Sequence, residues 1–132
     1  MGEITQEGAQ NVGNIYLANQ LQNANLYLGL FTNDITEPLA DQTLATIVEP
    51  IAADYARATL VPASWVVVGE IATYPEIEFS VVTAEFGNIY GCFLATTVDS
   101  SGKLVLIDKF SSVKTLDFYG DRLAITPRIT IT

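Results

Sequence analysis

The feature that most constrains the fold is a succession of short apolar runs that begins at Leu26 and continues through the rest of the sequence. The runs are rich in β-branched and aromatic residues, and Gly, Pro, Asn and Asp separate them. Runs of this kind are typical of strands, whereas an amphipathic helix needs a longer segment with helical apolar spacing. Parallel strands would need helical crossovers longer than any candidate segment here. The sequence therefore predicts an all-β fold with antiparallel strands.

Two of the runs are apolar on both of their faces. In Ala24–Asn33, three leucines alternate with Tyr27, Gly29 and Phe31, and Ile89–Val98 has the same character. A strand with two apolar faces is covered on both sides, so we expect these two runs to lie inside a sheet. The other expected strands are Tyr55–Leu60, Ser64–Val68, Ile71–Tyr74, Glu76–Val82, Lys103–Phe110 and Arg122–Thr132.

The segments between the runs predict how the strands are connected. Asp99–Gly102 is the strongest turn signal and predicts a hairpin between the strands on either side of it. Ile35–Val48 is a long connection with a short helical turn, because Pro38 suits a helix start and Pro50 prevents its continuation. Pro127 removes a ladder donor from the last strand and so indicates an edge or a bulge. We therefore expect an antiparallel, jelly-roll-like β-sandwich over residues 26–132, with one long, partly helical loop.

Residues 1–25 differ from the rest of the chain. Nine of them are Asn or Gln, and a few apolar residues are scattered among three glycines. A short helix over Val12–Gln22 and a simple disordered tail are both alternatives, but such a segment buries too little apolar area to offset its own ordering entropy. We expect an extended N-terminal arm that a neighbouring chain orders. Its candidate partner-binding residues are Ile4, Val12, Ile15, Tyr16, Leu17 and Leu21.

The charge of the chain argues against a nucleic-acid partner. Six Lys and Arg stand against 15 Asp and Glu, a formal net charge of -9, and no Lys or Arg precedes Arg57. Nucleic-acid affinity comes mostly from cationic contacts that release counterions. We therefore expect neither DNA nor RNA to bind.

The residue types that usually carry catalysis are missing or badly spaced. The sequence has no histidine, which excludes Ser–His and Cys–His nucleophile pairs. Glu76 and Glu78 share one face of a strand, but paired catalytic carboxylates usually come from different elements of a cleft. Asp99, Asp117 and Asp121 lie in turns that lack the ligand spacing of a calcium loop. We expect a protein that is not an enzyme and holds no cofactor or metal.

Three single features complete this picture. Cys92, the only cysteine, has hydrophobic neighbours and no nearby base, which predicts a buried, unreactive thiol. Trp65 is the only tryptophan, so a carbohydrate-binding platform has weak support. No apolar run approaches the ~20 residues that a bilayer requires, and the N-terminus lacks the basic region and apolar stretch of a secretory leader. We therefore expect no membrane partner and synthesis in the cytosol.

Several short motifs together resemble a protein family. They are LYLGLFTND (Leu26–Asp34), Thr43–Ala45 before Glu49-Pro50, DYARATL (Asp54–Leu60), Trp65, IYGCF (Ile89–Phe93) and YGDRLAITP (Tyr119–Pro127). In this combination the chain resembles small structural proteins of tailed bacteriophages, in particular head decoration or cement proteins.

The resemblance implies a function and a set of partners. Such proteins are compact β domains, often trimeric, that sit on the capsid surface and clamp neighbouring capsomers of the major capsid protein. It therefore implies a virion protein made in the host cytoplasm, with the arm as the clamp. The alternatives are a tail or baseplate component and a carbohydrate- or receptor-binding module of the virion.

Overall fold

A computed structural model describes residues 3–5, 24–68 and 71–130 of the chain. This part consists mainly of strands that all pair antiparallel, as the sequence predicts. The strands are β1 (Glu3–Ile4), β2 (Leu26–Phe31), β3 (Ala58–Leu60), β4 (Val66–Val68), β5 (Ile71–Thr73), β6 (Ile77–Ser80), β7 (Gly87–Ala95), β8 (Leu104–Leu116), β9 (Arg122–Ile125) and β10 (Arg128–Thr130). Three short 3-10 helices are η1 (Leu39–Asp41), η2 (Leu44–Thr46) and η3 (Pro62–Ser64). No helix among the described residues is long and apolar enough to cross a membrane.

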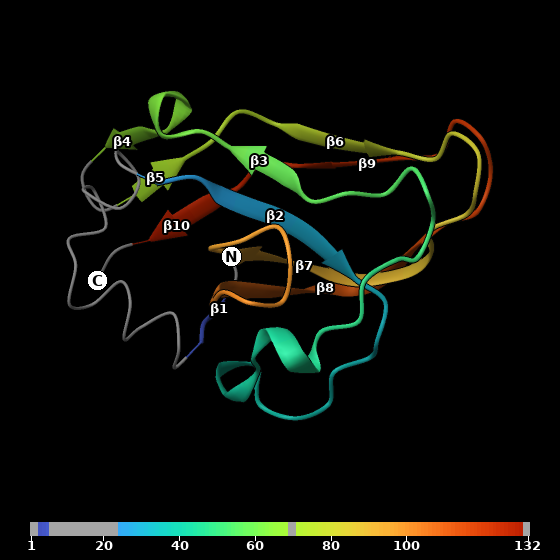
Figure 1. The fold of residues 1–132 in the computed structure, drawn as a ribbon, viewed down its shortest axis with the longest axis horizontal. Helices are drawn as coiled ribbons and strands as arrows, with labels where there is room; N and C mark the ends of the chain where they lie inside the picture. Colours follow the sequence, from blue (N-terminus) through green and yellow to red (C-terminus); the bar gives the residue numbers. More distant parts are fainter. Residues whose placement is uncertain (1–2, 6–23, 69–70, 131–132) are drawn as a thin grey trace.

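The strands form one large sheet and two small ones (Figure 1). The large sheet has the order β1-β8-β7-β2-β3, and the small sheets have the orders β10-β5-β4 and β6-β9. Both strands that are apolar on two faces, β2 and β7, lie inside the large sheet, which confirms that prediction.

The large sheet separates two apolar clusters. One cluster, which includes Leu28 and Phe79, lies between this sheet and the two small sheets. The other includes Phe31, Phe93 and Leu44, and it lies under the long connection between β2 and β3. In Figure 1 this connection, with η1 and η2, covers the side of the large sheet that faces away from β6 and β9. Both faces are therefore buried from Leu28 to Phe31 in β2 and from Gly91 to Ala95 in β7.

An irregularity in the β7–β8 pairing keeps apolar side chains on the correct face. Ile89 and Cys92 both belong to the cluster beneath the small sheets, although strict alternation would put them on opposite faces. The register of β7 against β8 shifts between Ile89 and Gly91, which reverses the alternation at this point. A second shift between Leu94 and Ala95 acts near the other end of β7.

Two glycines in the large sheet are covered by phenylalanines from the adjacent strand. Gly29 of β2 lies opposite Phe93 of β7, and Phe31 of β2 lies opposite Gly91 of β7. A Cβ atom on Gly29 would overlap the Phe93 ring, and one on Gly91 would overlap the Phe31 ring and the Asp108 carbonyl oxygen. The two Gly-x-Phe triplets thus fit together because the glycines leave room for the rings.

Several expected strands have other ends in the structure: β3 begins at Ala58, β4 begins at Val66, and β7 ends at Ala95. Two further strands differ more. The single strand predicted over Arg122–Thr132 is wrong: β9 pairs with β6, and β10 pairs with β5. Pro127 separates them, because it has no N–H to donate, and its carbonyl oxygen accepts the N–H of Tyr74 at 2.9 Å. The strand expected to end at Phe110 continues to Leu116, since its polar, exposed end is held by backbone pairing with β7 rather than by side-chain burial.

Candidate functional site

The structure describes only the first of the predicted arm residues. The backbone of Ile4 lies in β1, opposite Leu106 at the edge of the large sheet, and the Thr5 hydroxyl donates to the Leu104 carbonyl oxygen. Residues 3–5 of the expected arm therefore join the large sheet of their own chain. The alternative helix over Val12–Gln22 lies outside the described residues. So do the other candidate arm residues, Val12, Ile15, Tyr16, Leu17 and Leu21.

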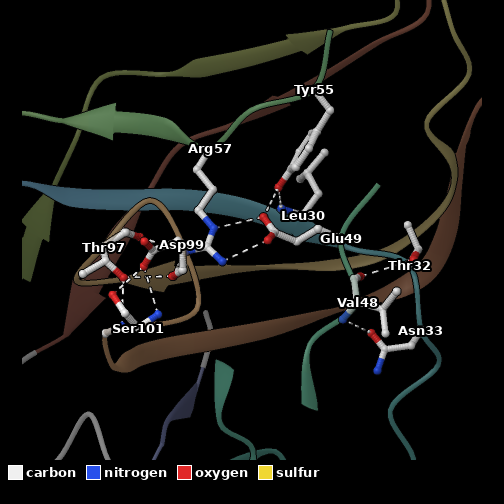
Figure 2. A network of polar contacts seen from close by, with 11 residues as sticks. Leu30, Thr32, Asn33, Val48, Glu49, Tyr55, Arg57, Thr97, Asp99 and Ser101 are labelled. Atoms are coloured by element: carbon white, nitrogen blue, oxygen red, sulfur yellow. Dashed lines mark hydrogen bonds and ion pairs between the residues drawn. The ribbon is translucent and has the colours of Figure 1, made fainter. Parts of the chain in front are cut away.

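The main polar site of the described residues is a buried ion pair between Arg57 and Glu49 (Figure 2). The Arg57 Nε and Nη2 atoms donate to Glu49 Oε1 and Oε2 at 3.0 and 2.9 Å. The Arg57 side chain is only 4% exposed and that of Glu49 is 26% exposed. This bidentate geometry is the strong form of an arginine–carboxylate ion pair.

The same guanidinium also joins the long connection to the β7–β8 turn. Its Nη1 atom donates to the carbonyl oxygens of Thr97 and Asp99, at 2.7 and 2.8 Å. Its Cζ atom lies 5.0 Å from the centroid of the Phe93 ring, within reach of a cation–π interaction. Hydrogen bonds from Ser101 to the Asp99 carboxylate shape this turn and lower the pKa of Asp99. Arg57 thus fixes the hairpin to the rest of the large sheet.

Tyr55 extends the ion pair into the centre of β2. Its hydroxyl donates to Glu49 Oε1 at 2.7 Å and accepts the N–H of Leu30 at 2.9 Å. β3 pairs with β2 only from Leu26 to Leu28. At Leu30, where β3 no longer pairs with β2, the Tyr55 hydroxyl accepts the backbone N–H instead. Burial raises the pKa of Tyr55 above its ordinary value, which keeps the phenol protonated and able to donate.

The chemistry of this polar site is that of a structural clasp. The Arg57 guanidinium is bonded at all three of its nitrogens, and Glu49 uses both carboxylate oxygens within the chain. The part of the chain that the structure describes contains no group of three or more His, Cys, Asp or Glu that could hold a metal ion. The arrangement connects three segments that are distant in sequence.

Cys92 lies in the apolar cluster beneath the small sheets. It is buried, as predicted, and burial raises its pKa to about 12. It borders a cavity of about 200 Å³, whose lining includes Leu28 and Leu106 with Asp108 and Arg128. Ligand pockets usually measure ~300–1,000 Å³, so this space is small for a ligand.

The turn between β8 and β9 carries two exposed aromatic side chains. Asp121 Oδ2 accepts the N–H groups of Asp117 and Phe118, at 3.1 and 3.0 Å. Gly120 adopts a φ of +91°, which favours glycine. This cap leaves Phe118 and Tyr119 pointing into solvent, with exposed fractions of 74% and 82%. Asp117 and Asp121 therefore belong to a turn that Asp121 holds by hydrogen bonds from the backbone.

Other exposed apolar residues lie at β4 and in the long connection. All three valines of β4 are exposed, as are Val48 and Ile51.

The sequence analysis did not predict the Arg57 ion pair, although Arg57 is the first cationic residue after seven carboxylates, which was a usable signal. It also treated the valine triplet as an ordinary strand, although three consecutive valines do not alternate.

Comparison with known proteins adds no relative. No protein-family model, curated protein or solved structure matches the chain.

Proposed function

We propose that the protein is a structural component of a tailed-phage virion: a capsid cement protein that clamps neighbouring major capsid protein capsomers and stabilises the head. In this proposal it acts on the capsid surface as a homotrimer, performs no catalysis, and binds no nucleic acid or membrane. We also interpret the large and small sheets as a jelly-roll-like β-sandwich with one long, partly helical loop. The sequence motifs from Leu26 to Pro127 supply the resemblance behind this proposal.

The observation that carries the proposal is how the described residues use their polar and apolar groups. The buried Arg57 guanidinium bonds to Glu49 and to two backbone carbonyl oxygens. Large apolar side chains, by contrast, are exposed at an edge strand, at a turn and in a long connection. Exposed apolar side chains that gather in patches mark surfaces that bind other macromolecules. A chain with this distribution suits binding to a protein lattice.

The arm enters the proposal through β1. Because Glu3–Ile4 pairs with β8, an intact β1 covers the edge of the large sheet at Leu106 and Ile107. A deletion of residues 1–25 would remove this strand together with the rest of the arm. A sharper variant keeps β1 and replaces the other candidate contacts with Ser: Val12, Ile15, Tyr16, Leu17 and Leu21.

The test compares particles assembled with wild-type protein and with this arm variant. We expect the variant to fold but to lose most of its occupancy on heads and most of its protection against heat. Val98→Ser, which changes an exposed valine near the β7–β8 turn, is the control and should bind like wild type. Full occupancy and equal heat protection by the arm variant would show that the arm is not the clamp.

The alternative functions are a tail or baseplate component and a carbohydrate- or receptor-binding module, and exposed aromatic side chains favour the second. Electron microscopy of labelled particles separates a head location from a tail or baseplate location. A glycan-binding module could use the exposed Phe118 and Tyr119, and a glycan array tests it. Trp65 would not serve such a platform, because it is buried edge-on against Tyr74 with ring centroids 5.1 Å apart.

A further inference from the structure

β4 is an edge strand whose apolar side chains are not covered. It is the last strand in the order β10-β5-β4, so within the described residues no strand pairs with its outer side. Val66, Val67 and Val68 have exposed fractions of 60%, 45% and 73%. A strand on a sheet normally buries every second side chain. Here both faces of β4 are accessible, and no strand of the described residues pairs with the backbone groups of its outer edge.

The sequence around β4 lacks the charges that usually protect such an edge. No Asp, Glu, Lys or Arg occurs from Ala58 to Gly69, and β5 beside β4 is also uncharged. The strands of the remaining small sheet carry Glu78 and Arg122, and β10 carries Arg128. Natural edge strands commonly use charged side chains to prevent pairing with another chain.

The charge balance of the whole chain limits where a second copy could make contact. Two molecules with a net charge of -9 repel each other over most of their surfaces. Their repulsion is weakest where each presents an uncharged segment, and β4 lies within such a segment.

We propose that two copies of the chain pair through β4 in antiparallel register about a two-fold axis. Val67 then lies opposite Val67 of the second copy, and each Val66 lies opposite the second copy's Val68. The triplet reads the same in both directions, so every position is a valine–valine pair, and β-branched cross-strand pairs stabilise sheets. The pairing joins two three-stranded sheets into one and satisfies the outer backbone groups of both β4 strands.

The symmetry of this contact limits what it can build. A two-fold contact uses the same surface on both subunits and cannot close a trimer by itself. In a trimeric assembly, β4 pairing would instead connect one trimer to the next. The contact is short, and interfaces below ~1,200 Å² are typically weak, so we expect a dimer that forms only at high protein concentration.

Analytical ultracentrifugation of the full chain over a range of concentrations tests the proposal. Val67→Lys places two like charges opposite each other and should weaken dimerisation at least ~10-fold, a change of about 1.4 kcal/mol. Val113→Lys is the matched control, because Val113 lies on β8 and has the same exposed fraction, 45%. It should leave the dimer unchanged.

A charge-pair variant tests the register. Val66→Lys and Val68→Glu should each weaken the dimer by changing one member of two symmetric pairs. Combined in one chain, they place each lysine opposite the second copy's glutamate, so the double variant should recover the dimer in low salt and lose it in high salt. Hydrogen exchange of the wild-type chain gives a measurement without substitutions: amides of β4 should become more protected as concentration rises.

Three results would overturn the proposal. The wild-type chain could stay monomeric at every concentration, or Val67→Lys could dimerise as well as Val113→Lys. Single variants that weaken the dimer without recovery in the double variant would mean that β4 meets a different edge or register. Because free protein is used, none of these results depends on the proposed capsid role.

Discussion

Removing the guanidinium of Arg57 should destabilise the fold far more than removing an exposed one. Arg57→Met keeps an aliphatic stem and deletes the charged group that bonds to Glu49, Thr97 and Asp99. The variant leaves the Glu49 carboxylate with the Tyr55 hydroxyl as its described side-chain donor. It also releases two carbonyl oxygens of the β7–β8 turn.

The expected cost follows from the burial of the two partners. Truncating one partner of a buried ion pair typically costs ~3–5 kcal/mol. Glu49 is 26% exposed, so water can partly solvate its carboxylate, and we expect the lower end, ~3 kcal/mol. An unfolding entropy of ~2.1 cal/mol/K per residue gives ~280 cal/mol/K for 132 residues. The melting temperature should then fall by ~11 °C.

The assay is urea unfolding at pH 7, supported by calorimetry. Arg122→Met is the matched control, because Arg122 Nη1 lies 3.7 Å from Glu78 Oε1 and both side chains are exposed, at 65% and 47%. Such surface pairs contribute ~0–1 kcal/mol. A double variant, Glu49→Gln with Arg57→Met, should recover part of the lost stability because it removes the unpaired carboxylate.

The reasoning fails if Arg57→Met and Arg122→Met cost the same within ~0.5 kcal/mol. It also fails if the double variant is as unstable as the sum of the two single variants, because the two groups would then not interact.

Three further predictions concern the core and the Asp54 carboxylate. Gly91→Ala should lower the free energy of unfolding in urea by ~3 kcal/mol, because its Cβ would overlap the Asp108 carbonyl oxygen and the Phe31 ring. Gly87→Ala has open space but a φ of +82°, so it should cost only ~1–2 kcal/mol, and equal costs would contradict the close packing at Gly91. The pKa of Cys92 rises from 9.0 to about 12 on folding. The stability of wild type relative to Cys92→Ala should therefore be constant below about pH 9 and fall between about pH 9 and 12; the same pH dependence of stability for both proteins would argue against a buried thiol. Asp54 Oδ2 accepts the Val82 N–H at 2.7 Å, and this hydrogen bond lowers the pKa of Asp54. The stability advantage of wild type over Asp54→Asn should therefore be present above about pH 3.8 and shrink as the pH falls below it; a pH-independent difference would contradict a role for the ionised carboxylate.

Local pattern was enough to predict the class of fold and its central strands. The two-sided apolar character of Ala24–Asn33 and Ile89–Val98 predicted that they lie inside a sheet, because a strand with two apolar faces must be covered twice. The strands β2 and β7 within these segments do lie inside the large sheet. The same neighbours predicted that Cys92 is buried. The arm residues, the phage resemblance and the functional class stay predictions.

Pairing between distant segments was beyond the local pattern. Whether residues 122–130 form one strand or two depended on which strands lie beside them, and Pro127 only marked where a break was allowed. Likewise, Arg57 reaches carbonyl groups 40 and 42 residues away, and nothing near it in sequence indicates those partners.

The sequence by itself determined that this chain forms antiparallel strands, because side-chain alternation and turn residues act over a few positions. Only the tertiary structure decided which valines stay exposed on β4, which glycines lie beneath phenylalanine rings, and where the one buried arginine finds its partners. These features depend on the registers between strands, and a register is set by the packing of both faces at once.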